Sequence, residues 1–382
     1  MRFLHTADWH LGRQFHNVSL VEDQRYVLGQ LLSAAVAADV DAFIVAGDVF
    51  DRAVPSPEAV QLLDECLAEL VLERGIPVVM IAGNHDSGRR LGFAAGLLAR
   101  SGLHVYGRCA GPPTALTLAD RHGPVHFFGL PYAEPAEVRQ ASGEADIRSH
   151  AQAMDWLTRT ARAAVAGGER SVCVAHCFVA GGAESESERP LSVGGAAAVP
   201  ADCFKGFSYA ALGHLHRPQA IGERIRYSGS LLKYSFSEIA HAKSAAIVEL
   251  DPAGQPSVEP VPLRPRRDLR LLEGELARLL EGPAPGENPD DFLLVRLTDE
   301  RELLDPIGRL REIYPNVLHI ERPALQRAGA DPLRAHRAPG GDLELFRAFY
   351  AQAAGVELSE VQALAFQEVY DALLRQRQES SG

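Results

Sequence analysis

The sequence has 382 residues, enough for two or three domains of about 150 residues each, and its 46% hydrophobic residues are typical of a soluble protein with sizeable cores. With a formal net charge of -12 and a pI near 5.6, the chain lacks the overall basic character of most nucleic-acid-binding proteins, so contact with phosphate has to come from a local feature. Early polar residues exclude a signal peptide, no segment reaches the length of a membrane span, and five scattered cysteines favour reduced thiols over a zinc site, so we expect a cytoplasmic protein without a membrane association.

Apolar strands alternate with amphipathic helices in the first part of the chain. We expect strands over residues 2–7, 42–46 and 77–82, and helices over residues 22–38 and 58–74, where apolar residues recur at helical spacing. One more helix is expected over residues 149–166, and the remaining strands are expected over residues 103–106, 115–118, 125–130, 171–175, 209–212, 224–230 and 245–250. Residues 181–195 are small or acidic, have no such period, and are expected to form an irregular loop.

Polar side chains follow five of these strands at the point where each strand ends. Any one of them alone would be explained by a turn or a cap, but their recurrence at strand ends predicts a functional site. The residues are Asp8 and His10 after the first strand, then Asp48, then Asn84 and His85, then His176, and finally His214 and His216.

The metal-binding potential of this set follows from its donor atoms. Two carboxylates, one amide oxygen and four imidazoles are too many for one tetrahedral zinc ion, but they suit two divalent ions that share a carboxylate. Mixed oxygen and nitrogen donors without a thiolate favour manganese or iron. Two ions about 3.5–4 Å apart can bind the attacking and leaving oxygens of a phosphoryl displacement. Such ions would also make the site locally cationic within an acidic chain.

The motifs together resemble a known family. The segments Asp8-x-His10, Gly47-Asp48-x-x-Asp51, Gly83-Asn84-His85-Asp86, His176 and Gly213-His214-x-His216 are similar to the signature of the calcineurin-like metallophosphoesterases. Longer segments, such as His5-Thr6-x-Asp8-Trp9-His10-Leu11-Gly12 and Tyr227-Ser228-Gly229-Ser230, resemble the SbcD family of bacterial double-strand-break repair nucleases. The resemblance implies an α/β fold over residues 1–258, in which a β-sandwich is flanked by helices.

The resemblance also implies a role for each strand-end residue. His85 would be the catalytic histidine that binds no metal and protonates the leaving oxygen. Asp51 stands where archaeal relatives carry a second histidine, and Asp86 receives no role beyond orienting His85 or capping the following turn. The site would bind two divalent ions, expected to be Mn²⁺. One ion would be held by Asp8, His10 and His216, and the other by Asn84, His176 and His214. Asp48 would bridge the two ions.

Residues 259–324 change character and are expected to form a small α+β capping domain. Strands over residues 269–272, 292–297 and 317–320 alternate there with helices over residues 275–280 and 306–313. The basic run at its start is interpreted either as a solvated linker or as a contact to the DNA backbone. Candidate DNA-binding residues are Arg264, Arg266 and Arg267 in this run, and Arg89 and Arg90 after the third strand.

Residues 325–341 are expected to be a linker, and residues 342–378 a pair of C-terminal helices. Asp342 is placed to cap the first helix, and Ser359 and Gln362 have the spacing of a capping box for the second. The second helix has an apolar surface, which either packs on its own domain or binds a partner groove. The resemblance identifies this partner as the coiled-coil root of an SbcC-like ATPase. The candidate partner-binding residues are Phe346, Tyr350, Phe366, Tyr370 and Leu374.

The function implied by the resemblance is a two-metal-dependent DNA phosphodiesterase. It would act as a double-strand exonuclease and a single-strand or hairpin endonuclease, as a homodimer in an ATP-regulated DNA repair and recombination complex at the nucleoid. Two alternatives stay open from the residues alone. One is a phosphoesterase for a small or protein-bound phosphoester, which would share the metal site, and the other is a non-catalytic scaffold. No base-reading signature is present, so sequence specificity is not expected.

Overall fold

The computed structural model describes residues 1–188, 198–301 and 303–323, and in the C-terminal part residues 343, 346–347, 350–351, 357–366 and 369. The chain divides into two compact units. The first comprises Met1–Leu271 and Asn288–Leu294, and the second comprises Leu272–Glu287 and the described part of Val295–Gly382.

The first unit contains two six-stranded sheets. In the first sheet the four strands β1, β4, β5 and β6 run parallel, so that their carboxyl ends lie at one edge, while β13 runs antiparallel to β1 and to β14. The order across this sheet is β14 (Pro256–Pro262), β13 (Ser244–Leu250), β1 (Arg2–Thr6), β4 (Ala42–Ala46), β5 (Val78–Ile81) and β6 (Leu103–Tyr106).

The second sheet also has a parallel centre. Strands β12, β10, β9 and β8 run parallel, and the outer strands β11 and β7 pair antiparallel with their neighbours. The order is β11 (Gln219–Ile221), β12 (Ile225–Tyr227), β10 (Tyr209–Gly213), β9 (Arg170–His176), β8 (Gly123–Leu130) and β7 (Ala115–Asp120).

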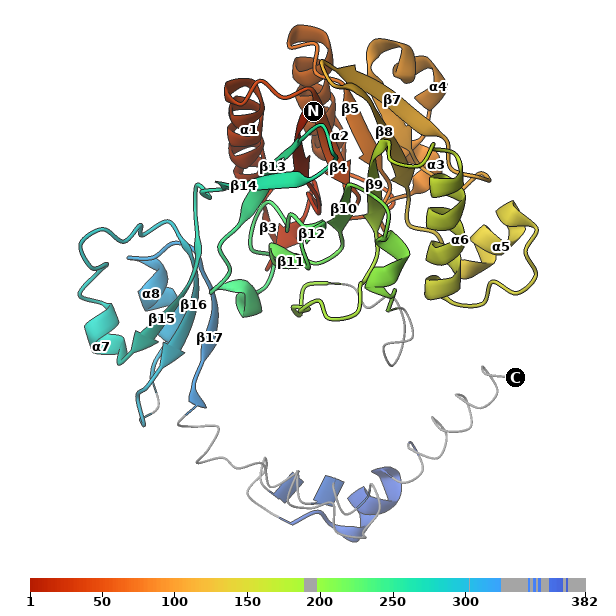
Figure 1. The fold of residues 1–382 in the computed structure, drawn as a ribbon. Coiled ribbons are helices and arrows are strands. Elements are labelled where there is room, and N and C mark those ends of the chain that lie inside the picture. The colour runs from red at the N-terminus through yellow and green to blue at the C-terminus, as the bar shows by residue number, and fades with distance from the viewer. Residues whose placement is uncertain are drawn as a thin grey trace. The chain divides into compact units, whose positions relative to one another are not determined.

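The two sheets pack face to face as a sandwich (Figure 1). Phe3 of the first sheet packs edge-on against Phe127 and Tyr209 of the second, with ring centroids 5.7 Å apart in both cases. Alternate residues along each strand face this interior, as the two-residue period of a strand requires. Ile44 and Val79 from one sheet and Val172 from the other belong to the same buried cluster. The predicted β-sandwich is therefore confirmed.

Helices cover the outer faces of the sandwich (Figure 1). Helices α1 (Val21–Ala37) and α2 (Pro57–Ala68) cover the first sheet, and α2 begins where Ser56 Oγ accepts the Ala59 N–H and Pro57 occupies the first turn. On the second sheet α5 (Pro135–Ser142) and α6 (His150–Ala163) bury side chains against β8 and β9. Short elements complete the unit: β2 (Gln14–Phe15), β3 (Val18–Ser19), the π-helix η1 (Glu69–Glu73), α3 (Gly88–Leu91), α4 (Ala95–Leu98), and the 3₁₀ turns η2 (Ala99–Ser101), η4 (Ala201–Phe204) and η5 (Phe236–Glu238).

After the sandwich the chain forms a three-stranded sheet with short helices. The predicted alternation of strands and helices is observed in this region, in the sheet order β15-β16-β17. The elements are β15 (Leu269–Gly274), α7 (Leu276–Leu279), β16 (Phe292–Leu297), α8 (Pro306–Arg311) and β17 (Val317–Glu321).

Most predicted elements are observed within a few residues of their expected ends. The helix expected over residues 58–74 is an α-helix only as far as Ala68, and η1 replaces its last turn. The β2–β3 hairpin was not predicted, because its strands are too short to show a period. All five cysteines are unpaired thiols, as expected. Among the helices that the structure describes, none combines the length and the apolar character needed to span a membrane.

Candidate metal centre and catalytic site

The loops after β1, β4, β5, β9 and β10 meet at one edge of the sandwich. Main-chain hydrogen bonds join the first two loops, from the Asp8 N–H to Gly47 O at 3.0 Å and from the His10 N–H to Asp48 O at 2.9 Å. At the end of β9, His176 Nδ1 donates to the carbonyl oxygen of Ala46 in the other sheet, at 3.0 Å. The strand-end residues are therefore neighbours in space, although the sequence separates them widely.

Several of these residues have an unusual main-chain conformation. The φ angle is 51° at Asp8, 45° at His10, 47° at Asp48 and 108° at His214. Residues other than glycine seldom adopt such angles, and where they do they often lie at functional sites. The loops also approach closely, because a Cβ on Gly83 would collide with Asp48.

Asp8, His10 and His216 form the first group of donors. Each has a donor atom within 4.8 Å of the others, and all three side chains are buried. The Nε2 atoms of His10 and His216 lie 3.1 Å apart. Two nitrogen donors about 2.1 Å from one ion, at a right angle to each other, would lie about 3 Å apart. The pair therefore has the spacing of two ligands to one metal ion.

The second group lies beside the first. Asn84 Oδ1 is 2.9 Å from His176 Nε2, and the His214 ring centroid is 5.5 Å from that of His176. Asp48 lies between the two groups, with its Oδ2 atom 3.7 Å from His10 Nε2 and 3.5 Å from His176 Nε2. A carboxylate oxygen in this position can bridge two divalent ions, so the donor set suits a two-metal centre.

Burial and mutual interaction change the pKa values of these groups. Burial lowers the pKa of His10, and it lowers that of His214 to about 3, so both rings are neutral as metal binding requires. Burial alone would also lower the pKa of His176, but Asp48 and Asp8 outweigh it and raise this pKa to about 9. Burial raises the pKa of Asp8, and the nearby Asp48 adds to the effect. Without a metal ion, His176 thus carries a proton that balances the carboxylates.

His85 lies beside the donors but makes different contacts. Its ring Nδ1 is 2.9 Å from the main-chain oxygen of Asp51, and its main-chain N–H donates to Asp48 Oδ1 at 2.9 Å. The Nε2 atom is 4.0 Å from Asp48 Oδ2, and the side chain is 15% exposed. The ring is therefore fixed at Nδ1 and the side chain is partly exposed, which suits a residue that exchanges a proton with a substrate.

Asp86 and Asp51 have structural contacts that the sequence did not reveal. The Asp86 carboxylate accepts the main-chain N–H groups of Val49, Phe50 and Gly83 at 2.9–3.0 Å, so it joins the loops after β4 and β5 and caps its own turn. Burial raises the pKa of Asp86 to about 7. Asp51 accepts a hydrogen bond from Arg13 at 2.9 Å.

Sequence reasoning missed the residues that support the donors from behind. Gln24 donates to the carbonyl oxygens of Trp9 and His10, at 3.1 and 2.7 Å, and Tyr234 donates to Trp9 O at 2.6 Å. The Tyr227-Ser228-Gly229-Ser230 motif was a sequence signal for the residues that surround His216, because Ser230 is one of them. The residues behind His216 are Ser187, Glu188, Ser230, Glu238 and Lys243.

The predicted DNA-binding arginines lie in different surroundings. Arg89 is exposed and lines a polar cavity of about 250 Å³ beside Asn84. Arg90 lines an apolar groove instead. Arg264 and Arg266 are exposed. Arg267 forms an ion pair with the buried Asp23, and its guanidinium lies 4.4 Å from the centroid of the Phe292 ring, so its contacts are internal to the first unit.

The predicted partner-binding residues are only partly described. Phe346 stacks on Phe366 with ring centroids 4.0 Å apart, and Tyr350 lies beside Phe346 at 6.3 Å. The predicted capping box is observed, because Ser359 Oγ accepts the Gln362 N–H while Gln362 Oε1 accepts the Ser359 N–H. Tyr370, Leu374 and the proposed cap Asp342 lie outside the described residues.

Comparison with known proteins agrees with this geometry. The model of a family described as calcineurin-like phosphoesterase matches residues 1–218, and one described as type 5 capsule protein repressor C-terminal domain matches residues 265–354. Among curated proteins, the SbcD subunit of nuclease SbcCD from Staphylococcus epidermidis is 33% identical over 321 residues, which cover 84% of this chain and 85% of that protein.

Solved structures of lower similarity were also found. A 5′-nucleotidase precursor from Thermus thermophilus is 14% identical, with a TM-score of 0.36 over 69% of this chain and 54% of that one. The anchor in the inner membrane complex of Plasmodium is 12% identical, with a TM-score of 0.38 over 71% of this chain and 91% of that one. The sequence matches decide the assignment: the chain belongs to the calcineurin-like phosphoesterases and, among them, to the SbcD family of nuclease subunits.

Proposed function

We propose that this protein is a two-metal-dependent DNA phosphodiesterase, the nuclease subunit of an SbcCD-like repair complex. The observation that carries the proposal is the position of Asp48 Oδ2, 3.7 Å from His10 Nε2 and 3.5 Å from His176 Nε2, between two groups of donors. Two bound divalent ions, which we propose to be Mn²⁺, would supply an activated water and charge stabilisation at the phosphorus.

The chain's own groups orient the ligands and move a proton. Because a carbonyl oxygen only accepts, the bond from His176 Nδ1 to Ala46 O leaves Nε2 of that ring free to bind a metal. The bond between His85 Nδ1 and Asp51 O likewise leaves Nε2 of His85 to face the substrate. In its imidazolium form, His85 gives the Nε2 proton to the leaving oxygen as the P–O bond breaks, and the neutral ring keeps its bond to Asp51.

The remaining parts of the proposal concern substrate and assembly. The protein would act in the cytoplasm at the nucleoid, as a double-strand exonuclease and as an endonuclease on single strands and hairpins. Exposed Arg89, Arg264 and Arg266 would contact DNA phosphates, and residues 259–324 would cap the nuclease domain of residues 1–258. Beyond the linker of residues 325–341, the helices within residues 342–378 would bind the coiled coil of an SbcC-like ATPase.

A comparison of substrates tests this function. The purified protein is incubated with linear plasmid DNA, with a hairpin oligonucleotide and with a small chromogenic phosphodiester, and Mn²⁺, Mg²⁺ and Zn²⁺ are tested separately. We expect both DNA substrates to be cleaved, fastest with Mn²⁺. Cleavage of the small ester alone would instead indicate a phosphoesterase for small substrates, and no cleavage of any substrate would indicate a non-catalytic scaffold.

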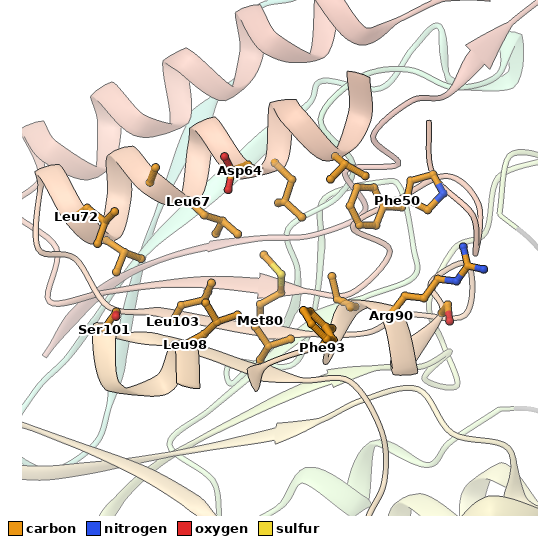
Figure 2. Close-up of a pocket in the computed structure, with 18 of the residues that line it drawn as sticks. Phe50, Asp64, Leu67, Leu72, Met80, Arg90, Phe93, Leu98, Ser101 and Leu103 are labelled. Atoms are coloured by element: carbon orange, nitrogen blue, oxygen red, sulfur yellow. The ribbon is translucent and has the colours of Figure 1, made fainter. Parts of the chain in front are cut away.

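An apolar groove in the first unit supports the homodimer. It has a volume of about 700 Å³, and Figure 2 shows Leu67, Met80 and Leu103 among the side chains around it. Phe93 and Leu72 also line this groove and are 79% and 73% exposed. Exposed apolar side chains along one groove are typical of an interface.

The charges in the groove suit a second copy of the same chain. Asp64 and Arg90 both line it, so a twofold axis can bring the carboxylate of one copy to the guanidinium of the other. Light scattering after size exclusion should give a dimer for the wild type and a monomer for Phe93→Glu. Leu304→Glu, at an 89% exposed leucine outside the groove, is the control and should stay dimeric. A monomeric wild type at micromolar concentration contradicts the homodimer.

A further inference from the structure

A buried polar network lies behind His216, on the side of the ring that faces away from His10. While His216 Nε2 faces His10, its Nδ1 lies 2.7 Å from Ser187 Oγ and 3.3 Å from Glu238 Oε1. The side chains of His216 and Glu238 are buried. No metal-ligand role assigned above uses Ser187 or Glu238, so their contacts with His216 need a separate explanation.

Lys243 balances the charge of this network. Its Nζ donates to His216 O and to Ser230 Oγ, at 2.8 Å each, and forms an ion pair with Glu238. These contacts use all three N–H groups of the ammonium. A buried carboxylate is costly unless it is paired, so the buried Lys243 allows Glu238 to keep a negative charge behind His216.

The direction of the hydrogen bonds selects one form of the His216 ring. Because an ionised carboxylate only accepts, the Ser187 hydroxyl donates to Glu238 and its oxygen accepts from the Nδ1–H of His216. The proton is thus held at Nδ1, and the Nε2 lone pair points toward His10. Metal-binding histidines commonly have such a partner on the other nitrogen, and its loss lowers metal affinity.

A segment that precedes His216 in the chain supplies part of the network. Ser187 belongs to residues 185–188, which follow β9 in the stretch expected to be an irregular loop. Glu188 Oε1 accepts the main-chain N–H of His216 at 2.7 Å, and the same carboxylate accepts the Ser185 N–H. The segment therefore holds both the ring and the main chain of His216.

We propose that Ser187 and Glu238 are positioning residues for His216, and that docking of residues 185–188 is coupled to metal binding at Asp8, His10 and His216. The inference rests on the metal-binding role of His216 in the proposed function. If docking raises the affinity of the site for metal, then metal must strengthen docking by the same factor, because linkage is reciprocal. The coupling can therefore be measured from either side.

Metal affinity provides the first test. Mn²⁺ binding to the full-length protein is measured by calorimetry for the wild type, Glu238→Gln and Ser187→Ala. Glu238→Gln keeps the size of the side chain but removes the charge, and we expect it to bind Mn²⁺ about 10–100-fold more weakly. Ser187→Ala should weaken binding as well. Glu223→Gln, at an exposed carboxylate, is the matched control and should bind as the wild type does.

Hydrogen exchange provides the second test and needs no activity. In the wild type, saturating Mn²⁺ should slow exchange of the amides of residues 185–188. In Ser187→Ala, the protection of these amides by Mn²⁺ should fall by the same factor as the affinity for Mn²⁺. If Glu238→Gln does not fold, as judged by circular dichroism, Ser187→Ala and the wild-type exchange decide the question.

The outcomes separate this inference from the proposed function. The coupling would be overturned if the folded variants bound Mn²⁺ as tightly as the wild type does. It would also be overturned if hydrogen exchange of residues 185–188 did not respond to Mn²⁺. Cleavage of DNA by the wild-type protein is assayed in parallel. A protein that shows the coupling but cleaves no DNA supports the inference and contradicts the nuclease proposal. A protein that cleaves DNA without the coupling contradicts the inference alone.

Discussion

His85 Nδ1 donates a hydrogen bond to the main-chain oxygen of Asp51 at 2.9 Å. The acceptor is a carbonyl, so the bond persists in both protonation states of the ring and fixes which nitrogen faces the substrate. The side chain of Asp51 takes no part in it, and replacing that side chain alone should leave the orientation of His85 intact.

The first prediction concerns His85→Ala. The variant should bind Mn²⁺ within about threefold of the wild type, while its rate of DNA cleavage should fall by about 10²–10⁴, the usual contribution of a general acid. Calorimetry and a cleavage assay measure the two quantities. His122→Ala, at an exposed histidine away from the site, should change neither. Cleavage at the wild-type rate would show that the role assigned to His85 is wrong.

The second prediction is a pH dependence of metal binding. In the metal-free protein, Asp48 and Asp8 raise the pKa of His176 to about 9, so below that pH a proton occupies the position that a metal must take. Metal binding should therefore release a proton, and the association constant should rise about tenfold per pH unit up to about pH 9. Calorimetry in buffers of different ionisation enthalpy counts the released protons. An association constant that does not change between pH 6 and pH 8 would contradict this mechanism.

The third prediction uses a glycine of the site. A Cβ at Gly83 would collide with Oδ1 and the main-chain N of Asp48, so Gly83→Ala should displace Asp48 and weaken Mn²⁺ binding at least tenfold. Gly29→Ala, in helix α1 with no atom within 4 Å of the new Cβ, is the matched control. It should keep the metal affinity and stabilise the fold by about 1 kcal/mol. Equal metal affinity in the two variants would argue against the close approach of these loops.

The fourth prediction concerns stability. Arg170 donates twice to Asp120, at 2.6 and 2.8 Å, and the amino group of Met1 contacts the same carboxylate. The hydrogen bonds from Arg170 hold the pKa of Asp120 well below its ordinary value of 3.8. Asp120→Asn should therefore lower the free energy of unfolding by about 3 kcal/mol at pH 7, since it breaks a largely buried pair. The difference from the wild type should shrink below about pH 4, because the Asp120 carboxylate of the unfolded wild-type chain takes up a proton there while the native carboxylate stays ionised.

Urea denaturation at pH 7, 5 and 3.5 measures this effect. Asp202→Asn removes an exposed ion pair with Lys205 and should change the stability by less than about 1 kcal/mol. A difference between Asp120→Asn and the wild type that grows on acidification would contradict the sign of the linkage.

The fifth prediction concerns the C-terminal helices. Val361 and Leu364 are 77% and 67% exposed, although Phe346 and Phe366 stack on each other nearby. Val361→Asp with Leu364→Asp should abolish co-purification with the ATPase and leave Mn²⁺-dependent cleavage by the isolated subunit unchanged. Truncation after residue 335 should do the same. Tight binding of the ATPase to the truncated chain would show that these helices are not its docking site.

The meeting of these polar side chains could be predicted from the sequence because each follows a short apolar strand within a recognisable motif. Parallel strands bring their carboxyl ends to one edge, so the fold class and the strand-end residues followed from local patterns. The left-handed φ angles of Asp8, His10 and Asp48 left no trace in those patterns. They arise only where the loops bond to one another, as in the hydrogen bond from His10 N–H to Asp48 O.

Contacts between distant segments were beyond sequence reasoning. Ser187 and Glu238 reach His216 across different loops, and no spacing rule relates them. Arg267 stood in a basic run that suggested DNA binding, and nothing in that run indicated its ion pair with Asp23, 244 residues away. A charge run shows where cations are in the sequence, whereas the path of the chain decides which of them reach solvent.

The joining of the two sheets at the strand ends has a consequence for unfolding. Asp8, His10, Asp48 and Asn84 follow strands of one sheet, and His176, His214 and His216 end or follow strands of the other. An ion bound by donors from both sheets would hold the sheets together, so neither sheet could separate while the ion stays bound. Each ion at 100 times its dissociation constant should therefore add about 2.7 kcal/mol to the stability of the whole sandwich, and chelation should lower its melting temperature.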